Sequence, residues 1–394
     1  MSVRKRKGLH KKSWQVDYRD GQDHRRSKQF ATKKEADAFA ATAAVEVREG
    51  VHVADSATVT VREAGNLWLA AAEASGLERS TTGQYGQHLN LHITPLLGTV
   101  KLSQLNVPRV RAFADALQKA GRSPAMIRKV LVSLGSLLAD AQERGLTARN
   151  PVRDMRRLRR PQREGRCKLQ VGTDIPSPAE IRSIVHAATG RWRPPIVTAI
   201  FTGLRSSELR GLHWTSVDLD QRIIYVRQRV DRYGQIGPPK SEAGTRSVPL
   251  PPIVVNTLRE WRLACPKGDL NLVFPNASGR PMSHQDLINR GLIPTLVAAG
   301  LAAPLLDGQG QAVLGKRGEP VIRGKYTGLH SLRHWYASWC INRRADGGLE
   351  LPPKTVQERL GHSTISMLMD TYGHLFPASD DAEVLAQGER ALLA

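Results

Sequence analysis

The pattern of apolar and polar residues predicts a small mixed domain at the start of the chain. Apolar and polar side chains alternate in Ser13–Tyr18, and a second strand is predicted over Arg25–Phe30 after an Asp-Gly turn. Thr32 and Glu35 then have the three-residue spacing of a helix capping box. We therefore predict a small β-sheet with one helix over residues 1–55.

The next segment has the 3.6-residue period of amphipathic helices. Between Pro124 and Arg144, valines and leucines recur at positions that share one helix face, and Gly145 ends the pattern. Nothing in this segment suggests catalysis. The pattern predicts an all-α domain over residues 58–152, and the Arg-rich stretch after it predicts an exposed basic linker over residues 153–175.

Residues 176–394 combine helical and strand periods. Ser177–Glu180 places Ser, Pro and Glu where the start of a helix prefers them. Arg222–Val230 and Thr245–Leu250 alternate like the two strands of a hairpin, and the Gly-rich, polar residues 302–325 predict a loop insertion. The whole pattern predicts a multidomain, mainly α fold with small β elements, which ends in an α+β domain.

The balance of charged residues indicates which class of partner the protein binds. The chain has 58 Lys and Arg against 36 Asp and Glu, a formal net charge of +22. A nucleic-acid backbone releases counterions when cations neutralise its phosphates, so nucleic acid is the favoured partner. A basic protein whose charge serves only solubility is the simpler alternative.

The cysteines and the apolar runs argue against a disulfide-rich, zinc-binding, secreted or membrane-spanning protein. Cys167, Cys265 and Cys340 are odd in number and far apart, without a CxxC pair, so neither a disulfide framework nor a zinc site is expected. The N-terminus has no apolar stretch typical of a secretory signal. The longest apolar run, Leu292–Leu306, is short and broken by prolines. We expect a cytoplasmic protein with no membrane partner.

The second half also carries five short motifs in a fixed order. They are TGLRSSEL (202–209), PPKSEAGTRSVPL (238–250), HSLRH (330–334), LGH (360–362) and DTYGH (370–374). Together they resemble the catalytic domain of tyrosine recombinases of the phage integrase family. The resemblance is close over residues 176–378, so the tyrosine-recombinase catalytic fold is expected for residues 176–394, with a C-terminal tail.

Upstream the resemblance is looser. It implies a helical, SAM-like core-binding domain at residues 58–152 and an arm-type DNA-binding domain at residues 1–55. Such a layout resembles the three-domain integrases of temperate phages.

The resemblance assigns the two arginines to the phosphate of the DNA strand. Arg205 and Arg333 match the family's phosphate clamps, and Glu208 matches a supporting acid. Arg suits this task because its planar, permanently charged fork donates two parallel hydrogen bonds to phosphate oxygens. Read alone, Arg205 would be a structural ion-pair partner of Glu208.

Three further positions match the family's acid, base and phosphate donor. Lys240 resembles the general acid that protonates the leaving 5′ oxygen, although a lysine in a turn is by itself usually only solvated. His330 resembles the general base, and it lies one helical turn before Arg333. His362 matches the histidine that hydrogen-bonds the scissile phosphate.

Tyr372 resembles the nucleophile. Its spacing from Ile365 and Leu368 is equally typical of an aromatic residue in a helix core, but Gly373 predicts that the helix ends at the tyrosine. In the family the attack yields a 3′-phosphotyrosyl link and a free 5′ hydroxyl. The bond energy is retained, so the resemblance implies no cofactor, neither metal nor ATP.

The implied function is site-specific recombination of phage or mobile-element DNA. The implied partners are duplex DNA attachment sites and a homotetramer on DNA, with an excisionase and a host DNA-bending protein as candidate accessory partners. Two alternatives stay open at this point. One is relaxation of DNA as in type IB topoisomerases, and the other is a non-catalytic DNA-binding regulator on the same scaffold.

Overall fold

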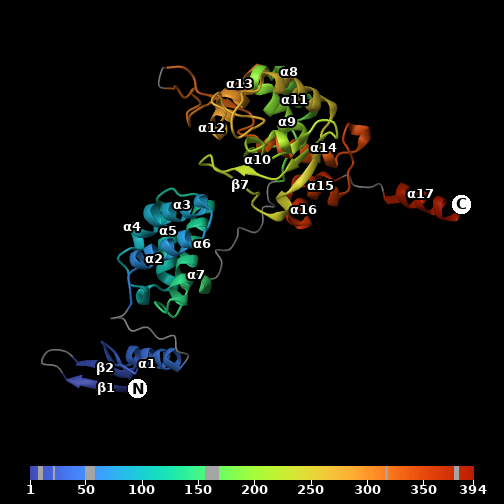
Figure 1. Ribbon diagram of the computed structural model, residues 1–394. Helices are drawn as coiled ribbons and strands as arrows, with labels where there is room; N and C mark the ends of the chain where they lie inside the picture. The colour runs from blue at the N-terminus through green and yellow to red at the C-terminus, as the bar shows by residue number, and fades with distance from the viewer. Residues whose placement is uncertain (8–11, 21–22, 49–57, 156–167, 316–317, 377–380) are drawn as a thin grey trace. The chain divides into compact units, whose positions relative to one another are not determined.

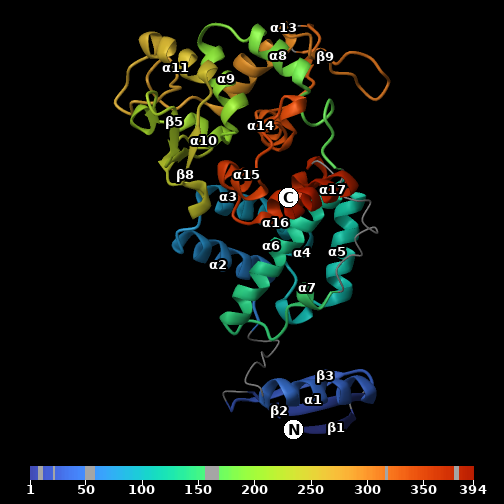
Figure 2. The same ribbon diagram turned by 90° about the vertical axis from the view of Figure 1, so that its right-hand side faces the viewer.

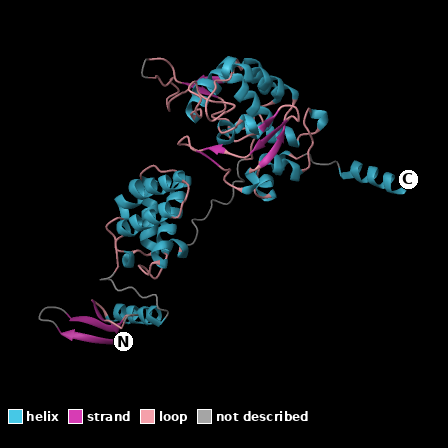
Figure 3. Cartoon of the chain, in the orientation of Figure 1, coloured by secondary structure: helices cyan, strands magenta, loops and turns pink. Residues whose placement is uncertain are grey.

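The structure is a computed structural model that describes residues 1–7, 12–20, 23–48, 58–155, 168–315, 318–376 and 381–394. Helix dominates these residues, and strands are confined to small sheets (Figure 3). The backbone divides into two compact units, Met1–Arg163 and Glu164–Ala394. The predicted multidomain, mainly α fold is therefore confirmed. Most of the predicted linker, and Cys167, lie outside the described residues.

The first unit begins with a three-stranded antiparallel sheet in the order β1-β2-β3. Its elements are β1 (Ser2–Lys7), β2 (Lys12–Arg19), β3 (Arg25–Phe30) and α1 (Lys33–Arg48). Helix α1 lies along one face of this sheet (Figure 1). Val16 and Tyr18 alternate onto that face and are buried there with Ala36. The predicted capping box is present. The backbone amide of Thr32 donates to the Glu35 carboxylate at 3.2 Å, and the amide of Glu35 donates to the Thr32 hydroxyl at 3.3 Å.

An all-helical bundle completes this unit (Figure 2). Its helices are α2 (Val61–Ala74), α3 (Arg79–His88), the π-helical turn η1 (Leu89–Ile93), α4 (Thr94–Leu97), η2 (Leu102–Gln104), α5 (Val107–Lys119), α6 (Pro124–Glu143) and α7 (Pro151–Asp154). The apolar stripe of α6 faces inward, so that Val130, Leu134 and Leu137 are fully buried. Trp68 stacks on Tyr85 in the same core.

Over its described residues, the second unit is a helical domain with three small sheets. Its helices are α8 (Pro178–Ala187), η3 (Gly190–Trp192), α9 (Arg193–Thr202), α10 (Ser206–Arg210), η4 (Trp214–Ser216), η5 (Glu242–Gly244), α11 (Pro252–Ala264), α12 (His284–Asp286), η6 (Leu287–Leu292), α13 (Ile293–Ala298), α14 (His330–Ile341), η7 (Arg344–Asp346), α15 (Pro353–Leu360), α16 (Ile365–Tyr372), η8 (Gly373–Leu375) and α17 (Asp381–Leu393). Its strands are β4 (Val217–Asp218), β5 (Ile223–Val226), β6 (Arg229–Val230), β7 (Ile236–Gly237), β8 (Arg246–Pro249), β9 (Ala302–Pro304) and β10 (Ile322–Gly324).

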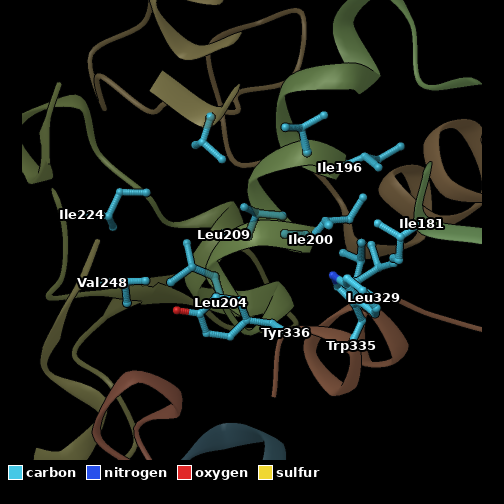
Figure 4. Close-up of a cluster of buried hydrophobic side chains, with 14 of the residues drawn as sticks. Ile181, Ile196, Ile200, Leu204, Leu209, Ile224, Val248, Leu329, Trp335 and Tyr336 are labelled. Carbon is cyan, nitrogen blue, oxygen red and sulfur yellow. The ribbon is translucent and has the colours of Figure 1, made fainter. Parts of the chain in front are cut away.

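Helix α9 forms the centre of this domain. Ile196 and Ile200 of α9 are fully buried, and Figure 4 shows them beside Leu204, Trp335 and Tyr336. Because α9 is apolar on every side, it must be surrounded by other elements. The packing fixes the end of α9 against α14, and both of these segments carry sequence motifs.

The single strand predicted over Arg222–Val230 is wrong. β5 pairs with β4 and β8, whereas β6 pairs with β7 in a separate sheet. The chain leaves the first sheet so that its backbone at Arg229 can pack closely on Gly211, where a Cβ atom would lie 2.8 Å from the Arg229 carbonyl carbon. Gln228 secures the bend by donating to the Gly211 carbonyl at 2.7 Å.

The plain loop predicted over residues 302–325 is also wrong. β9 and β10 pair antiparallel at its base. Beyond them, the amide of Leu305 donates to Val321, that of Val321 to Val313, and that of Val313 to Leu305, at 2.7 to 2.8 Å. The insertion is therefore a hydrogen-bonded β-rich arm, in which apolar residues are interspersed among glycines. No described helix is long and apolar enough to cross a membrane.

Candidate active site

Tyr372 is the last residue of α16, as the sequence predicted, and its side chain is only 1% exposed. Thr364 caps the start of this helix by accepting from the Met367 amide at 3.2 Å. Burial raises the pKa of the Tyr372 phenol to about 12, although the nearby charges of Arg333 and Arg205 oppose this shift. The hydroxyl is therefore protonated in the resting protein and needs a base to become a nucleophile.

The Tyr372 hydroxyl lies 2.7 Å from Nδ1 of His334. His334 was not among the predicted site residues. It follows His330 by four residues on α14, and the two rings meet edge to face with their centroids 4.5 Å apart. Burial, followed by His330 and Arg333, lowers the pKa of His334 to about 4. The ring is therefore neutral at pH 7 and has one nitrogen free to accept a proton.

Arg333 lies on the same helix and is 2% exposed. Its Nη1 donates to the Gly203 carbonyl at 2.6 Å, and its Nη2 donates to the Leu360 carbonyl. Burial, then Arg205 and Arg246, lower the pKa of Arg333. The guanidinium is thus held on neutral carbonyls, in a region with an excess of positive charge.

Arg205 joins the same cluster from the start of α10. Its Nη2 donates to the Gly361 carbonyl at 2.8 Å, and its Nη1 lies 2.7 Å from Oε1 of Glu208. Glu208 is thus the structural partner that the spacing predicted. The side chain of Arg205 is 36% exposed, so this clamp can still reach a ligand from solvent.

Arg246 is a second residue that the sequence reasoning missed. It lies on β8, is 5% exposed, and donates its Nη2 to Oε2 of Glu208 at 2.8 Å. Burial alone would raise the pKa of Glu208, but the hydrogen bond and charge of Arg246 and the charge of Arg205 lower it to about 2. Glu208 is therefore an anion that holds two arginines in place.

All three arginines donate hydrogen bonds to backbone carbonyls at the C-terminal end of α15. Arg246 Nε donates to the Arg359 carbonyl at 2.7 Å, beside the carbonyls of Leu360 and Gly361 that accept from Arg333 and Arg205. The end of a helix carries partial negative charge and unpaired carbonyls, which makes it a natural anchor for cations. Gly361 ends the helix in the left-handed region, with φ of 64°.

His362 follows this turn directly. Its ring lies nearly parallel to that of Tyr372, at 9° and 6.2 Å between centroids. Gln357 holds the backbone by donating to the His362 carbonyl at 2.8 Å, whereas Nδ1 of the ring has no partner among the described residues. Burial and the three arginines lower the pKa of His362 to about 4. One buried ring nitrogen of His362 is therefore left without a hydrogen bond from the described part of the chain.

His330 and Lys240, the other two predicted catalytic residues, are both exposed. His330 is the first residue of α14 and its side chain is exposed. Burial of part of the ring, and then the charges of Arg333 and Arg205, lower its pKa. Lys240 is exposed in the segment between β7 and β8, after the short β6–β7 hairpin and not within its turn. The predicted place of Lys240 is confirmed, because β5 pairs with β8 and Lys240 lies in the connection between these two strands.

The structure thus brings Arg205, Glu208, Arg333, His362 and Tyr372 into one site, and it adds Arg246 and His334. Within the described parts of the chain, His, Cys, Asp and Glu side chains form no group of three that could hold a metal ion. A cationic cluster beside a tyrosine hydroxyl can bind a phosphodiester and supply a nucleophile to it.

Two known recombinases are similar to this chain in sequence. The chain is 26% identical to a tyrosine recombinase XerC-like protein of Caldanaerobacter subterraneus subsp. tengcongensis, over 88% of this chain and 87% of the relative. It is 24% identical to the prophage integrase IntR of Escherichia coli, over 68% of this chain and 61% of that protein.

Solved structures share the fold. The Tn1549 transposon integrase, in complex with a circular intermediate DNA, matches with a TM-score of 0.60 and 21% identity over 85% of this chain and all of that one. The lambda integrase dimer bound to a COC′ core site matches with a TM-score of 0.56 and 18% identity over 93% of this chain and 95% of that one. The profile of the phage integrase family matches residues 177–378. The chain is a tyrosine recombinase and belongs to the phage integrase family.

Proposed function

We propose that this protein is a site-specific DNA recombinase that cuts and rejoins duplex DNA through a covalent bond to Tyr372. The observation that carries the proposal is that the Tyr372 phenol lies within the electrostatic reach of Arg333 and Arg205. Among the described contacts, Glu208 is the only carboxylate that pairs with this arginine cluster. The cluster has more positive charge than its own chain neutralises. A DNA phosphodiester supplies the missing anion.

Arg205 and Arg333 are the proposed phosphate clamps. Their donors now rest on backbone carbonyls and on Glu208, so they are already oriented before DNA binds. Donors fixed in advance stabilise the charge that grows on the phosphate without any reorganisation, and loss of one such donor typically costs roughly 100- to 1000-fold in rate. His362 adds its unpartnered ring nitrogen as a further hydrogen bond to phosphate.

The chemistry follows from the nucleophile and the leaving group. The Tyr372 oxygen attacks phosphorus, the bond to the 5′ oxygen breaks, and a 3′-phosphotyrosyl link forms. Lys240 is the proposed acid that protonates the 5′ oxygen, and His330 is the base candidate that the family resemblance supplies. The freed 5′ hydroxyl of another strand can reverse the step, which rejoins DNA without ATP.

The partners are duplex DNA attachment sites and further copies of the chain. A lambda integrase tetramer bound to a Holliday junction has the same fold, with a TM-score of 0.53 and 16% identity. By that likeness we propose a homotetramer that recombines phage or mobile-element DNA in the cytoplasm. An excisionase and a host DNA-bending protein remain candidate accessory partners.

Covalent trapping on nicked DNA tests this function. The wild-type chain is incubated with a nicked attachment-site duplex, taken from the DNA that flanks its gene, and denatured before electrophoresis. We expect a protein–DNA adduct that Tyr372→Phe does not form, whereas Tyr225→Phe, a control on β5, forms it normally. An equal yield from Tyr372→Phe would overturn the assignment of the nucleophile.

The same preparation separates the two alternatives. Relaxation of a supercoiled plasmid without an attachment site would favour topoisomerase-like activity. Specific binding of the attachment site without any adduct would favour a non-catalytic regulator.

A further inference from the structure

The hydrogen bond of the Tyr372 hydroxyl goes to His334, four residues beyond the histidine that the family resemblance favours as base. The Oη–Nδ1 distance is 2.7 Å, well within the range for proton transfer between a phenol and an imidazole. His330 meets His334 edge to face, but the structure gives it no hydrogen bond to the phenol. The contact to the nucleophile thus comes from the second histidine of the HSLRH motif.

We propose that His334 is the catalytic base that takes the proton of Tyr372 as the tyrosine attacks the phosphate. This inference rests on the proposed recombinase function and assigns one step of it. The Oη–H bond breaks, the proton passes to Nδ1 of His334, and the oxygen's electron pair forms the bond to phosphorus. The 5′ oxygen leaves with the electrons of the broken P–O bond and takes a proton from Lys240. Rejoining returns both protons.

The position of His334 on α14 keeps its ring in place. The helix is anchored one residue earlier, because Arg333 donates to carbonyls of Gly203 and Leu360. On the outer side, His334 lines a surface hollow with Leu169, Thr364, Thr371 and His374. One edge of the ring therefore contacts the nucleophile while its surroundings open to solvent, which lets the imidazole exchange its proton with water between steps.

The charged groups around His334 suit its proposed role as a base. Burial and the charges of His330 and Arg333 lower its pKa and the charge of Asp174 raises it, while Lys168, Asp370 and His374 line the same hollow. Burial and the cations keep the ring neutral in the free protein, so that it can accept a proton. A bound phosphodiester brings negative charge to the same place and favours the imidazolium that the step creates. The base is therefore available before DNA binds and is strengthened when it binds.

A sulfur-substituted substrate separates the base from the acid. In a nicked duplex with sulfur in place of the bridging 5′ oxygen, the leaving group is a thiol, which ionises near pH 8.5 and needs no acid. We expect Lys240→Ala to form adduct slowly on the oxygen substrate and at a near wild-type rate on the sulfur substrate. His334→Ala should lose roughly 100-fold or more on both substrates. His330→Ala is the matched control on the same helix and should lose less than His334→Ala on the sulfur substrate.

The pH profile separates a base from a residue that only positions the phenol. His334→Asn keeps a polar group that can hydrogen-bond the phenol but cannot take its proton. The single-turnover rate on the sulfur substrate should rise through one ionisation and level off in the wild type. With His334→Asn it should keep rising with pH, so that the deficit shrinks towards the pKa of the phenol.

Each outcome decides between named alternatives. If His334→Asn retains the wild-type rate, or if its deficit is the same at every pH, His334 is not the base. If His330→Ala carries the larger, pH-dependent loss, the base is His330. If the wild type forms no adduct with either substrate, the recombinase function itself fails. Should His334→Ala not fold, as judged by circular dichroism, His334→Asn and the wild-type profile still decide the question.

Discussion

Arg246 and Glu208 face each other in a paired contact in which Nη2 lies 2.8 Å from Oε2 and Nη1 lies 3.1 Å from Oε1. Both side chains are almost fully buried. The same carboxylate accepts from the backbone amide of Arg205 at 2.9 Å and from its guanidinium. One carboxylate therefore holds β8, α10 and two arginines together.

Replacing Glu208 by Gln should destabilise the catalytic unit strongly. Breaking a buried ion pair from one side leaves an uncompensated charge and typically costs about 3–5 kcal/mol. Urea unfolding of the full chain, followed by tryptophan fluorescence, measures the loss. The control is Glu358→Gln, which breaks the exposed pair with Lys354 and should cost at most about 1 kcal/mol. Equal losses in the two variants would mean that Glu208 is not the centre of the network.

The low pKa of Glu208 predicts acid sensitivity. Its folded-state pKa, about 2, lies below the value of 4.5 expected when the chain is unfolded. Stability from this carboxylate is therefore complete above about pH 4.5 and is lost as the pH falls towards 2. Burial raises the pKa of Glu180, but its hydrogen bonds with Lys325, Ser177 and Tyr326 lower it to about 2, so this carboxylate adds to the same window. Between about pH 4.5 and 2, the unfolding free energy of Glu208→Gln should fall less steeply with decreasing pH than that of the wild type, by the slope that one proton contributes.

Gly203 should not tolerate a side chain. It ends α9 with φ of 60°, and a Cβ atom there would overlap the ring of Tyr336. Gly203→Ala should therefore destabilise the fold more than Gly190→Ala, since Gly190 has φ of 52° but nothing within 4 Å of the added atom. The Gly190 variant measures backbone strain alone, roughly 1 kcal/mol. Thermal unfolding of both proteins gives the difference, and no difference would argue against the close packing of Tyr336.

Inorganic sulfate should stabilise the catalytic unit in the absence of DNA. The arginine cluster has unneutralised charge and one partly exposed guanidinium, that of Arg205. A ligand that binds only the folded state at 100 times its Kd adds about 2.7 kcal/mol. Melting curves in sodium sulfate, compared with sodium chloride of equal ionic strength, should show the gain, and Arg205→Ala should reduce it. The same gain in that variant would place the sulfate elsewhere.

The sequence predicted those parts of the fold that depend on local signals. The capping box of Ser177 and Glu180 is present, with hydrogen bonds of 2.8 and 3.3 Å, because both partners belong to one helical turn. Tyr372 ends its helix as expected, and Arg333 lies one turn after His330. The order of the motifs then led to the family that the comparisons show.

The sequence could not predict contacts between residues that lie far apart along the chain. Arg246 alternates in a strand like any exposed basic residue, and its role depends on Glu208, which is 38 positions away. His334 contacts Tyr372 across 38 positions as well, and its only local signal is the four-residue spacing from His330. The arm at residues 302–325 is held by backbone hydrogen bonds, which leave little trace in the side-chain pattern.

The anchor at the end of α15 consists of backbone carbonyls, at Arg359, Leu360 and Gly361. Every amino acid has a backbone carbonyl, so no substitution of a single residue can remove these acceptors. Only the path of the turn can be altered, and that depends on Gly361, where a Cβ atom would lie 2.8 Å from the Ala243 carbonyl oxygen. The arrangement of the arginines therefore depends on the backbone path at Gly361 and not on which side chains Arg359 and Leu360 carry.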